Sequence, residues 1–329
     1  MRLHRPALVV VVSFLAAAVL GVGAAFPGAG KTGDASAAVE ARGLYARDFI
    51  NVLQLIADLR SDAPAQPLVC LLGGSSARES TLSDQSWSDD VSARRGYEVM
   101  AVNLGSKHRL FAQDWRLIGY LPEGTDIVFV GVNMGRFCNG WSDPPIVLPE
   151  PSLAGEETRA ARESTRILPD WLKRHYAEEW MIKRWPYFRK RFRYNLGVLE
   201  RVCRRSLARG QHPVIIDMPR DMQIIGDLLD RPLRRYHRGC RALAERLGIP
   251  YVQFQASTGL TNRDFSDLWH TVKSGQIKWQ SKLSATTAML LKKYDVGPAP
   301  SPSASPSPPA SPEPTEEPSP SGLPSAAPR

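Results

Sequence analysis

The sequence predicts an α/β protein of three layers, in which about five parallel strands form a sheet between two layers of helices. Two observations lead to this prediction. Short apolar runs recur along the chain, and the segments between them have helical character. Such alternation is typical of parallel strands joined by right-handed crossovers. The predicted domain spans residues 38–296, a length that suits one hydrophobic core.

The elements follow from the sequence in chain order. Residues 38–59 are expected to form a helix, because their apolar side chains recur at helical spacing. Strands are expected at the apolar runs 67–72, 97–104, 126–132, 212–218 and 250–254. About 80 residues separate the third run from the fourth, which is more than a crossover needs and indicates an insertion. Its first part, 137–151, is rich in Pro and Gly and is expected to be a loop, whereas 156–209 is expected to be a helical, basic insertion.

The two ends of the chain differ from the predicted domain. Behind a short basic N-terminus, an uncharged apolar segment runs from Pro6 to Phe26, about the length that crosses a bilayer as a helix. We interpret 1–37 as a signal anchor and linker, with the domain outside the cytoplasm. Cleavage after Ala37 is the alternative and would give a secreted protein. The segment 297–329, mostly Pro, Ser and Ala, is expected to be a disordered tail.

Charge and cysteine content restrict the chemistry. The formal net charge of +9 is concentrated in the middle of the chain, so it describes one surface. The four cysteines are Cys70, Cys138, Cys203 and Cys240. They allow three complete pairings in an oxidising compartment, although Cys70 lies in the first predicted strand and is expected to be a buried free thiol. No Cys-x-x-Cys spacing and no spaced histidine pair occurs, so we predict no metal site and no cofactor.

Two motifs far apart in the chain suggest a catalytic triad. The first predicted strand ends in Gly-Gly-Ser75-Ser76, and Asp267 and His270 lie close together late in the domain. A serine hydroxyl becomes a good nucleophile when a histidine accepts its proton and a carboxylate orients that histidine. We predict Ser75 as nucleophile, His270 as base and Asp267 as the orienting carboxylate. Ser76 is the alternative nucleophile, and Asp267 could instead cap a helix that follows it.

Four segments resemble, in order, the conserved blocks of the SGNH, or GDSL-like, hydrolase family. They are Gly73-Gly74-Ser75, Asn103-Leu104-Gly105, Gly131-Val132-Asn133 and Asp267-Leu268-Trp269-His270. The resemblance implies a flavodoxin-like α/β/α fold and an acyl-serine at Ser75. It also implies an oxyanion hole made by the backbone N–H groups of Ser75 and Gly105 and the side chain of Asn133. The sequence departs from the family pattern at Gly74 and Met134, where the family has Asp.

These departures and the N-terminal segment look more like the cell-envelope branch of the family. That branch includes alginate and peptidoglycan O-acetylation proteins and the teichoic acid D-alanylation protein. The resemblance implies an extracytoplasmic O-acyl esterase or acyltransferase that acts on an envelope polysaccharide, with a membrane-bound O-acyltransferase as partner. Water as second substrate would make it an esterase, and a sugar hydroxyl a transferase. The alternative is a non-catalytic module that binds an envelope polymer or such a partner.

A basic and aromatic stretch in the helical insertion is a candidate contact surface. Its residues are Lys183, Arg184, Trp185, Arg189, Lys190, Arg191 and Arg193. We interpret it as contacting anionic lipid headgroups or a teichoic-type polymer, because Trp and Arg suit such an interface. Nucleic acid would attract the same side chains, but an extracytoplasmic location argues against it. The other interpretation is a solvated basic helix whose aromatic side chains belong to the core.

Overall fold

The computed structural model describes residues 44–140, 145–151 and 166–297. The predicted signal anchor, 1–37, and nearly all of the predicted tail lie outside these residues. Within the described ranges, no helix has the length and apolar character needed to cross a membrane. Contacts divide the chain into residues 1–50 and residues 51–329. In the first unit the structure describes the start of helix α3 (Leu44–Ser61); the sheet and the site belong to the second.

Five parallel strands form one sheet in the order β2-β1-β3-β4-β5. The strands are β1 (Leu68–Gly73), β2 (Met100–Gly105), β3 (Thr125–Val132), β4 (His212–Asp217) and β5 (Tyr251–Gln253). The predicted α/β class with a five-stranded parallel sheet is confirmed. The chain passes from β1 outward to β2 and then returns to the other side of β1 as β3. Ligands of open α/β sheets bind at such a switch point, outside the carboxyl ends of the strands.

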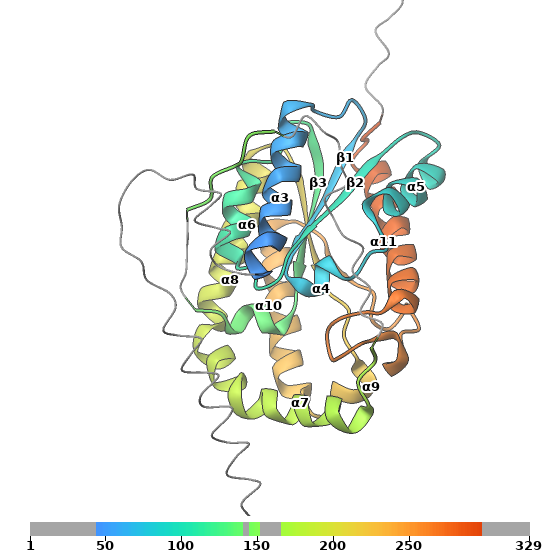
Figure 1. The fold of residues 1–329 in the computed structure, drawn as a ribbon. Coiled ribbons are helices and arrows are strands. Elements are labelled where there is room, and N and C mark those ends of the chain that lie inside the picture. Colours follow the sequence, from blue (N-terminus) through green and yellow to red (C-terminus); the bar gives the residue numbers. More distant parts are fainter. Residues whose placement is uncertain (1–43, 141–144, 152–165, 298–329) are drawn as a thin grey trace, which may run out of the picture. The chain divides into compact units, whose positions relative to one another are not determined.

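Helices cover both faces of the sheet (Figure 1). They are α5 (Asp84–Arg95) and α11 (Lys273–Lys293) on one face, and α6 (Phe111–Ile118), α8 (Trp185–Ala208) and α10 (Asp230–Leu247) on the other. Shorter or peripheral helices are α4 (Ser75–Arg78), α7 (Asp170–Lys183), α9 (Met222–Ile225) and the 3-10 helices η1 (Met134–Cys138) and η2 (Asn262–Asp264). The short ones lie where strands end, so they shape the site more than the core.

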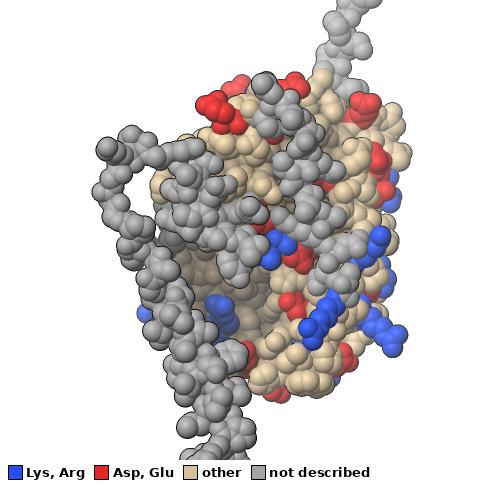
Figure 2. All heavy atoms as spheres, in the orientation of Figure 1, with Lys and Arg blue, Asp and Glu red and all other residues tan. Residues whose placement is uncertain are grey.

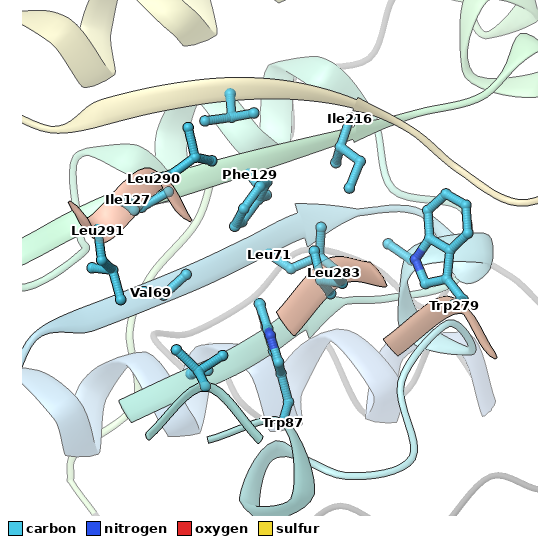
Figure 3. Close-up of a cluster of buried hydrophobic side chains, with 14 of the residues drawn as sticks. Val69, Leu71, Trp87, Ile127, Phe129, Ile216, Trp279, Leu283, Leu290 and Leu291 are labelled. Carbon is cyan, nitrogen blue, oxygen red and sulfur yellow. The ribbon is translucent and has the colours of Figure 1, made fainter. Parts of the chain in front are cut away.

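The core between the sheet and the α5–α11 face is built on two tryptophans. Trp87 and Trp279 are fully buried against strand side chains such as Leu71 and Phe129 (Figure 3). Each large apolar side chain buried in this way contributes about 1.5–3 kcal/mol to folding. Every residue of β1 is buried, because helices cover both of its faces. This explains why the strand reads as a continuous apolar run and not as an alternating pattern.

The described part of the predicted helical insertion, 156–209, contains the helices α7 and α8. Its second helix, α8, is the helix that covers the sheet between β3 and β4, because Val198, Leu199 and Val202 are buried in the face toward α6 and β4. Exposed arginines on the rest of the helix, such as Arg201 and Arg204, make this apolar stripe less evident in the sequence. Among the described residues of this range, those before α8, 166–184, include α7 and are additional to the sheet and its covering helices; residues 156–165 lie outside the described part of the chain.

Candidate active site

Ser75, His270 and Asp267 form one hydrogen-bonded chain at the carboxyl edge of the sheet. Ser75 opens α4 directly after β1, and the other two residues lie in the loop between η2 and α11. The Ser75 Oγ lies 2.8 Å from Nε2 of His270. The Nδ1 of His270 lies 2.7 Å from Oδ2 of Asp267. The structure therefore brings together the three residues that the sequence predicts as a triad, in the predicted order of contacts.

The loop that carries Asp267 and His270 is closed on itself. Its ends pair as an antiparallel bridge between Phe265 and Thr271, and the Ser266 N–H donates to the His270 carbonyl at 2.8 Å. The Asp267 Oδ1 accepts the backbone N–H groups of Trp269 and His270 at 2.8 and 3.0 Å. The capping alternative for Asp267 is wrong, because α11 begins only at Lys273 and its first turn follows Val272.

A second set of hydrogen bonds ties this loop to the nucleophile turn. The Thr271 hydroxyl donates to the carbonyl of Glu79, the residue that ends α4, and Nε2 of Gln276 donates to the same carbonyl at 3.1 Å. All three groups are buried. The base and the nucleophile are thus held by fixed contacts between segments almost 200 residues apart in the sequence.

Electrostatics in the triad favour a charged carboxylate and a more basic imidazole. Burial alone would raise the pKa of the Asp267 carboxyl, but its hydrogen bonds from His270 and the backbone lower it below its ordinary value. Burial alone would lower the pKa of His270, whereas the hydrogen bond and charge of Asp267 raise it. An orienting carboxylate is expected to have this effect, because it stabilises the imidazolium.

Ser76, the alternative nucleophile, lies in a different environment. Its side chain is almost completely buried, and its Oγ accepts a hydrogen bond from Nδ2 of Asn133 at 2.8 Å. The His270 imidazole is hydrogen-bonded to the Ser75 hydroxyl instead. The geometry therefore favours Ser75 over Ser76.

Two of the three residues predicted to supply oxyanion donors, Ser75 and Asn133, line the pocket. The N–H of Ser75 lies in the first turn of α4, where a helix has no carbonyl of its own to accept it. Asn133 follows β3, and its Oδ1 accepts the N–H of Arg136 at 3.0 Å. Its amide has two N–H donors, and the bond to Ser76 uses one of them. The second is left for a ligand in the pocket.

Gly105 lies elsewhere than the sequence predicts for an oxyanion donor. Its N–H donates to Oδ1 of Asn103 at 2.9 Å in a buried setting, and it does not line the pocket beside Ser75. A Cβ on Gly105 would come within 2.4 Å of the backbone nitrogen of Arg78. Gly105 therefore lets the end of β2 approach α4 closely, which is a packing role.

A pocket of about 220 Å³ opens beside Ser75. Figure 2 shows a hollow in this face of the molecule, above α7. The lining residues that the sequence analysis did not select are His108, Arg109, Gly135, Arg136, Asn139, Trp180 and Trp269. His108 has a left-handed backbone with φ 53°, a conformation that few residues other than glycine adopt. In the sequence, the only indication of a role for His108 is its place three residues after the end of β2.

The floor of the pocket rests on a buried ionic cluster. Arg136 forms an ion pair with Asp114 and donates from Nη1 to the Gly131 carbonyl at 2.6 Å. Its guanidinium also lies over the ring of Phe111, 3.9 Å from the centroid. Arg109 approaches the same Asp114 at 3.9 Å. Because all these groups are buried, they fix the loop after β3 and hence Asn133.

The seven residues of the predicted contact surface separate into two groups. Arg184 alone lines the pocket. Trp185 stacks on Phe188 with 5.5 Å between ring centroids, and Arg191 donates to the Cys138 carbonyl at 2.8 Å. The exposed members are Lys183, Arg184, Arg189, Lys190 and Arg193. Phe188 and Phe192 are buried beside Phe137, so these two aromatic side chains of the segment belong to the core.

The described residues were also compared with the requirements of a metal site and of a reactive thiol. In the part of the chain that the structure describes, no group of three or more His, Cys, Asp or Glu residues is arranged to hold a metal ion. All four cysteines lie in that part and are buried free thiols. Burial raises the pKa of Cys138 to about 12, even though Arg184 and Arg191 oppose the shift. This thiol is therefore a poor nucleophile at neutral pH.

Comparison with known proteins gives structural likenesses only. No protein-family model and no curated protein matches the sequence. The chain is similar to a "putative platelet activating factor" from Streptococcus pneumonia, with 12% identity over 80% of this chain and 99% of that chain and a TM-score of 0.44. It is similar to a "putative acylhydrolase" from Bacteroides fragilis, with 13% identity over 72% of this chain and 98% of that chain and a TM-score of 0.37. Such remote likenesses leave the function to be argued from the site.

Proposed function

We propose that the protein is a serine-dependent O-acyl esterase or acyltransferase of the SGNH type. The single observation that carries the proposal is the hydrogen-bonded chain from the Ser75 Oγ through His270 to Asp267. A serine, a histidine and a carboxylate in this order perform nucleophilic acyl transfer in several unrelated folds. These three hydrogen-bonded residues lie beside an open pocket at the switch point of the sheet, which supports the same conclusion.

The reaction would proceed in two halves. The Ser75 Oγ attacks the acyl carbon of an ester while Nε2 of His270 accepts the hydroxyl proton. The carbon–oxygen bond of the ester then breaks, and the leaving alcohol takes that proton from His270, which yields an acyl-serine. In the second half, His270 removes a proton from water or from an acceptor hydroxyl, and that oxygen attacks the acyl carbon. The bond between the acyl carbon and the Ser75 Oγ then breaks, and the Oγ takes the proton back from His270. Asp267 keeps its charge throughout and stabilises the imidazolium.

The negative charge that develops on the acyl oxygen needs donors in place. The N–H of Ser75 and the second amide N–H of Asn133 are the donors that this site offers. Losing one such donor typically costs about 3–4 kcal/mol of transition-state stabilisation. The non-catalytic alternative, a module that only binds a polymer, has no need of a histidine hydrogen-bonded to an accessible serine. That feature favours the enzyme.

The substrate and location rest on the sequence. The apolar segment from Pro6 to Phe26 supports an anchored domain outside the cytoplasm, where O-acylated envelope polysaccharides would be within its reach. A membrane-bound O-acyltransferase would be the natural donor partner if the reaction is transfer. The basic surface would then face an anionic polymer or lipid headgroups.

Turnover of O-acetylated polysaccharide tests this proposal. We expect the full chain to release acetate, or to move it to a glycan hydroxyl, and Ser75→Ala to lower kcat/KM by about 10⁴-fold or more. Asn133→Ala should lower kcat by about 10²–10³-fold. Acetate release and acetylated product are followed together by NMR. Undiminished turnover in Ser75→Ala would overturn the proposed mechanism.

A further inference from the structure

The residues that line the pocket carry an uneven charge. Three arginines, Arg109, Arg136 and Arg184, are among the residues that line it together with the triad histidine, and no lining residue is Asp or Glu. Arg109 and Arg136 are both buried and both lie close to Asp114. Arg184 has no ion pair with Asp114 and differs from them in being exposed. It places a positive charge at the rim of the pocket.

Arg184 also belongs to a second hollow. This outer hollow is lined by Ile182, Lys183, Arg184, Pro186 and Tyr187. Because Arg184 lines both cavities, they adjoin at its side chain. A ligand too long for the pocket would pass Arg184 and continue along Lys183. The outer hollow offers a second cation there and an aromatic ring at Tyr187, over which the guanidinium of Arg191 lies at 4.8 Å.

The positive charge of Arg184 acts on His108, another residue that lines the pocket. Burial, followed by the positive charges of Lys107 and Arg184, lowers the pKa of the His108 imidazole. Trp180 and Trp269 supply flat apolar walls on the same pocket. Flat aromatic faces beside cationic forks suit a ring that carries both apolar C–H surface and an anionic group.

We propose that the site takes an extended, negatively charged glycan, with Arg184 contacting a carboxylate, phosphate or sulfate on the unit next to the ester that Ser75 attacks. This inference rests on the proposed function and specifies its substrate. Arg184 is a specificity-determining residue in this account. Lys183 contacts the next anionic group along the chain, outside the pocket.

A pair of substrates that differ in charge tests the assignment. Acetate release is measured from O-acetylated polygalacturonate, which is anionic, and from O-acetylated dextran, which is neutral. We expect wild type to have the higher kcat/KM on the anionic polymer, and Arg184→Gln to lower the anionic-to-neutral ratio about tenfold, the size of a lost charge-assisted contact. Arg184→Lys should recover part of the ratio. Arg201→Gln, an exposed arginine of α8 outside both hollows, should leave the ratio at the wild-type value.

Two outcomes would overturn the inference. One is an anionic-to-neutral ratio that changes no more in Arg184→Gln than in Arg201→Gln. The other is hydrolysis of anionic lysophospholipid in vesicles with no turnover of the anionic polymer, which would assign the arginine to a lipid headgroup.

A binding measurement separates this inference from the proposed function. Polygalacturonate is titrated calorimetrically into the Ser75→Ala protein and into the Ser75→Ala/Arg184→Gln protein. Binding that weakens about tenfold in the double variant supports the anionic site even if wild type turns over no ester, a result that would sink only the proposed function. Equal binding by the two proteins, or binding by neither, contradicts the anionic site.

Discussion

At the scale of single residues, the site depends on which atoms the hydrogen bonds occupy. Ser75 and Ser76 are adjacent, and the sequence left Ser76 open as the alternative to Ser75; in the structure one is bonded to His270 and the other to Asn133. Gly105 and Asn133 likewise look equivalent as oxyanion donors. In the structure the Gly105 N–H donates to Oδ1 of Asn103, whereas the Asn133 amide keeps one N–H for a ligand. Such choices depend on atomic positions that a residue pattern does not contain.

The raised pKa of His270 predicts a pH dependence. A protonated imidazole cannot accept the Ser75 proton, so kcat/KM on a neutral aryl acetate should fall as the pH drops through a pKa above the ordinary histidine value of about 6.5. Asp267→Asn removes the charge that raises this pKa. The acidic limb should then move to lower pH, while kcat falls by about 10⁴-fold because the amide holds the imidazole in the wrong tautomer.

A full pH profile of both proteins checks this prediction. Asn262→Ala, a substitution in η2 just before this loop, serves as the control for general damage to the loop. The acidic limb of this variant should lie at the same pH as that of wild type. An acidic limb at the same pH in Asp267→Asn and wild type would show that Asp267 does not set the protonation of His270.

At the scale of elements, the histidine loop is supported by a buried ion pair. Lys173 of α7 is fully buried and lies 3.0 Å from Asp221, at the start of α9. The same ammonium donates to the carbonyls of Asn262 and Phe265 at 2.6 and 2.9 Å. Burial raises the pKa of Asp221 even though Lys173 opposes the shift. α7 thus holds the segment that precedes Asp267, in addition to supplying Trp180 to the pocket.

Removing Lys173 should therefore be costly. Lys173→Met leaves Asp221 buried without its cation, and we expect the free energy of unfolding to fall by about 3–5 kcal/mol. The double variant Lys173→Met/Asp221→Asn should recover part of this loss. Urea unfolding at neutral pH is the measurement. Arg204→Gln, which removes an exposed pair with Glu200, should cost under about 1 kcal/mol. A loss in Lys173→Met no larger than in this control contradicts the account.

The sequence predicted the strands and the triad but not these supports. Buried parallel strands appear as continuous apolar runs such as Leu68–Leu72, and the Ser, Asp and His motifs are local, so both kinds of signal survive in one sequence. Lys173 and Arg136 look like ordinary surface cations, because their partners Asp221 and Asp114 lie far along the chain. The apolar stripe of α8 was missed for a related reason: arginines on its exposed face dominate its composition.

At the scale of the molecule, the topology brings the motifs to one place. In the strand order, β1 lies between β2 and β3. Ser75, which follows β1, and Asn133, which follows β3, therefore lie at the same switch point. The loop before α11 returns His270 to this edge. The segment before α8 adds Trp180 and Arg184 to the pocket wall. A common α/β sheet thus supplies the chemistry, and the added basic segment supplies the selectivity that we propose.

Covalent labelling with a fluorophosphonate shows whether Ser75 is an activated nucleophile. The proposed triad predicts that wild type is labelled and that mass spectrometry locates the label on Ser75. Ser75→Ala should take up no label, whereas Ser76→Ala should still be labelled. Labelling that persists in Ser75→Ala, or the absence of any label in folded wild-type protein, would contradict it.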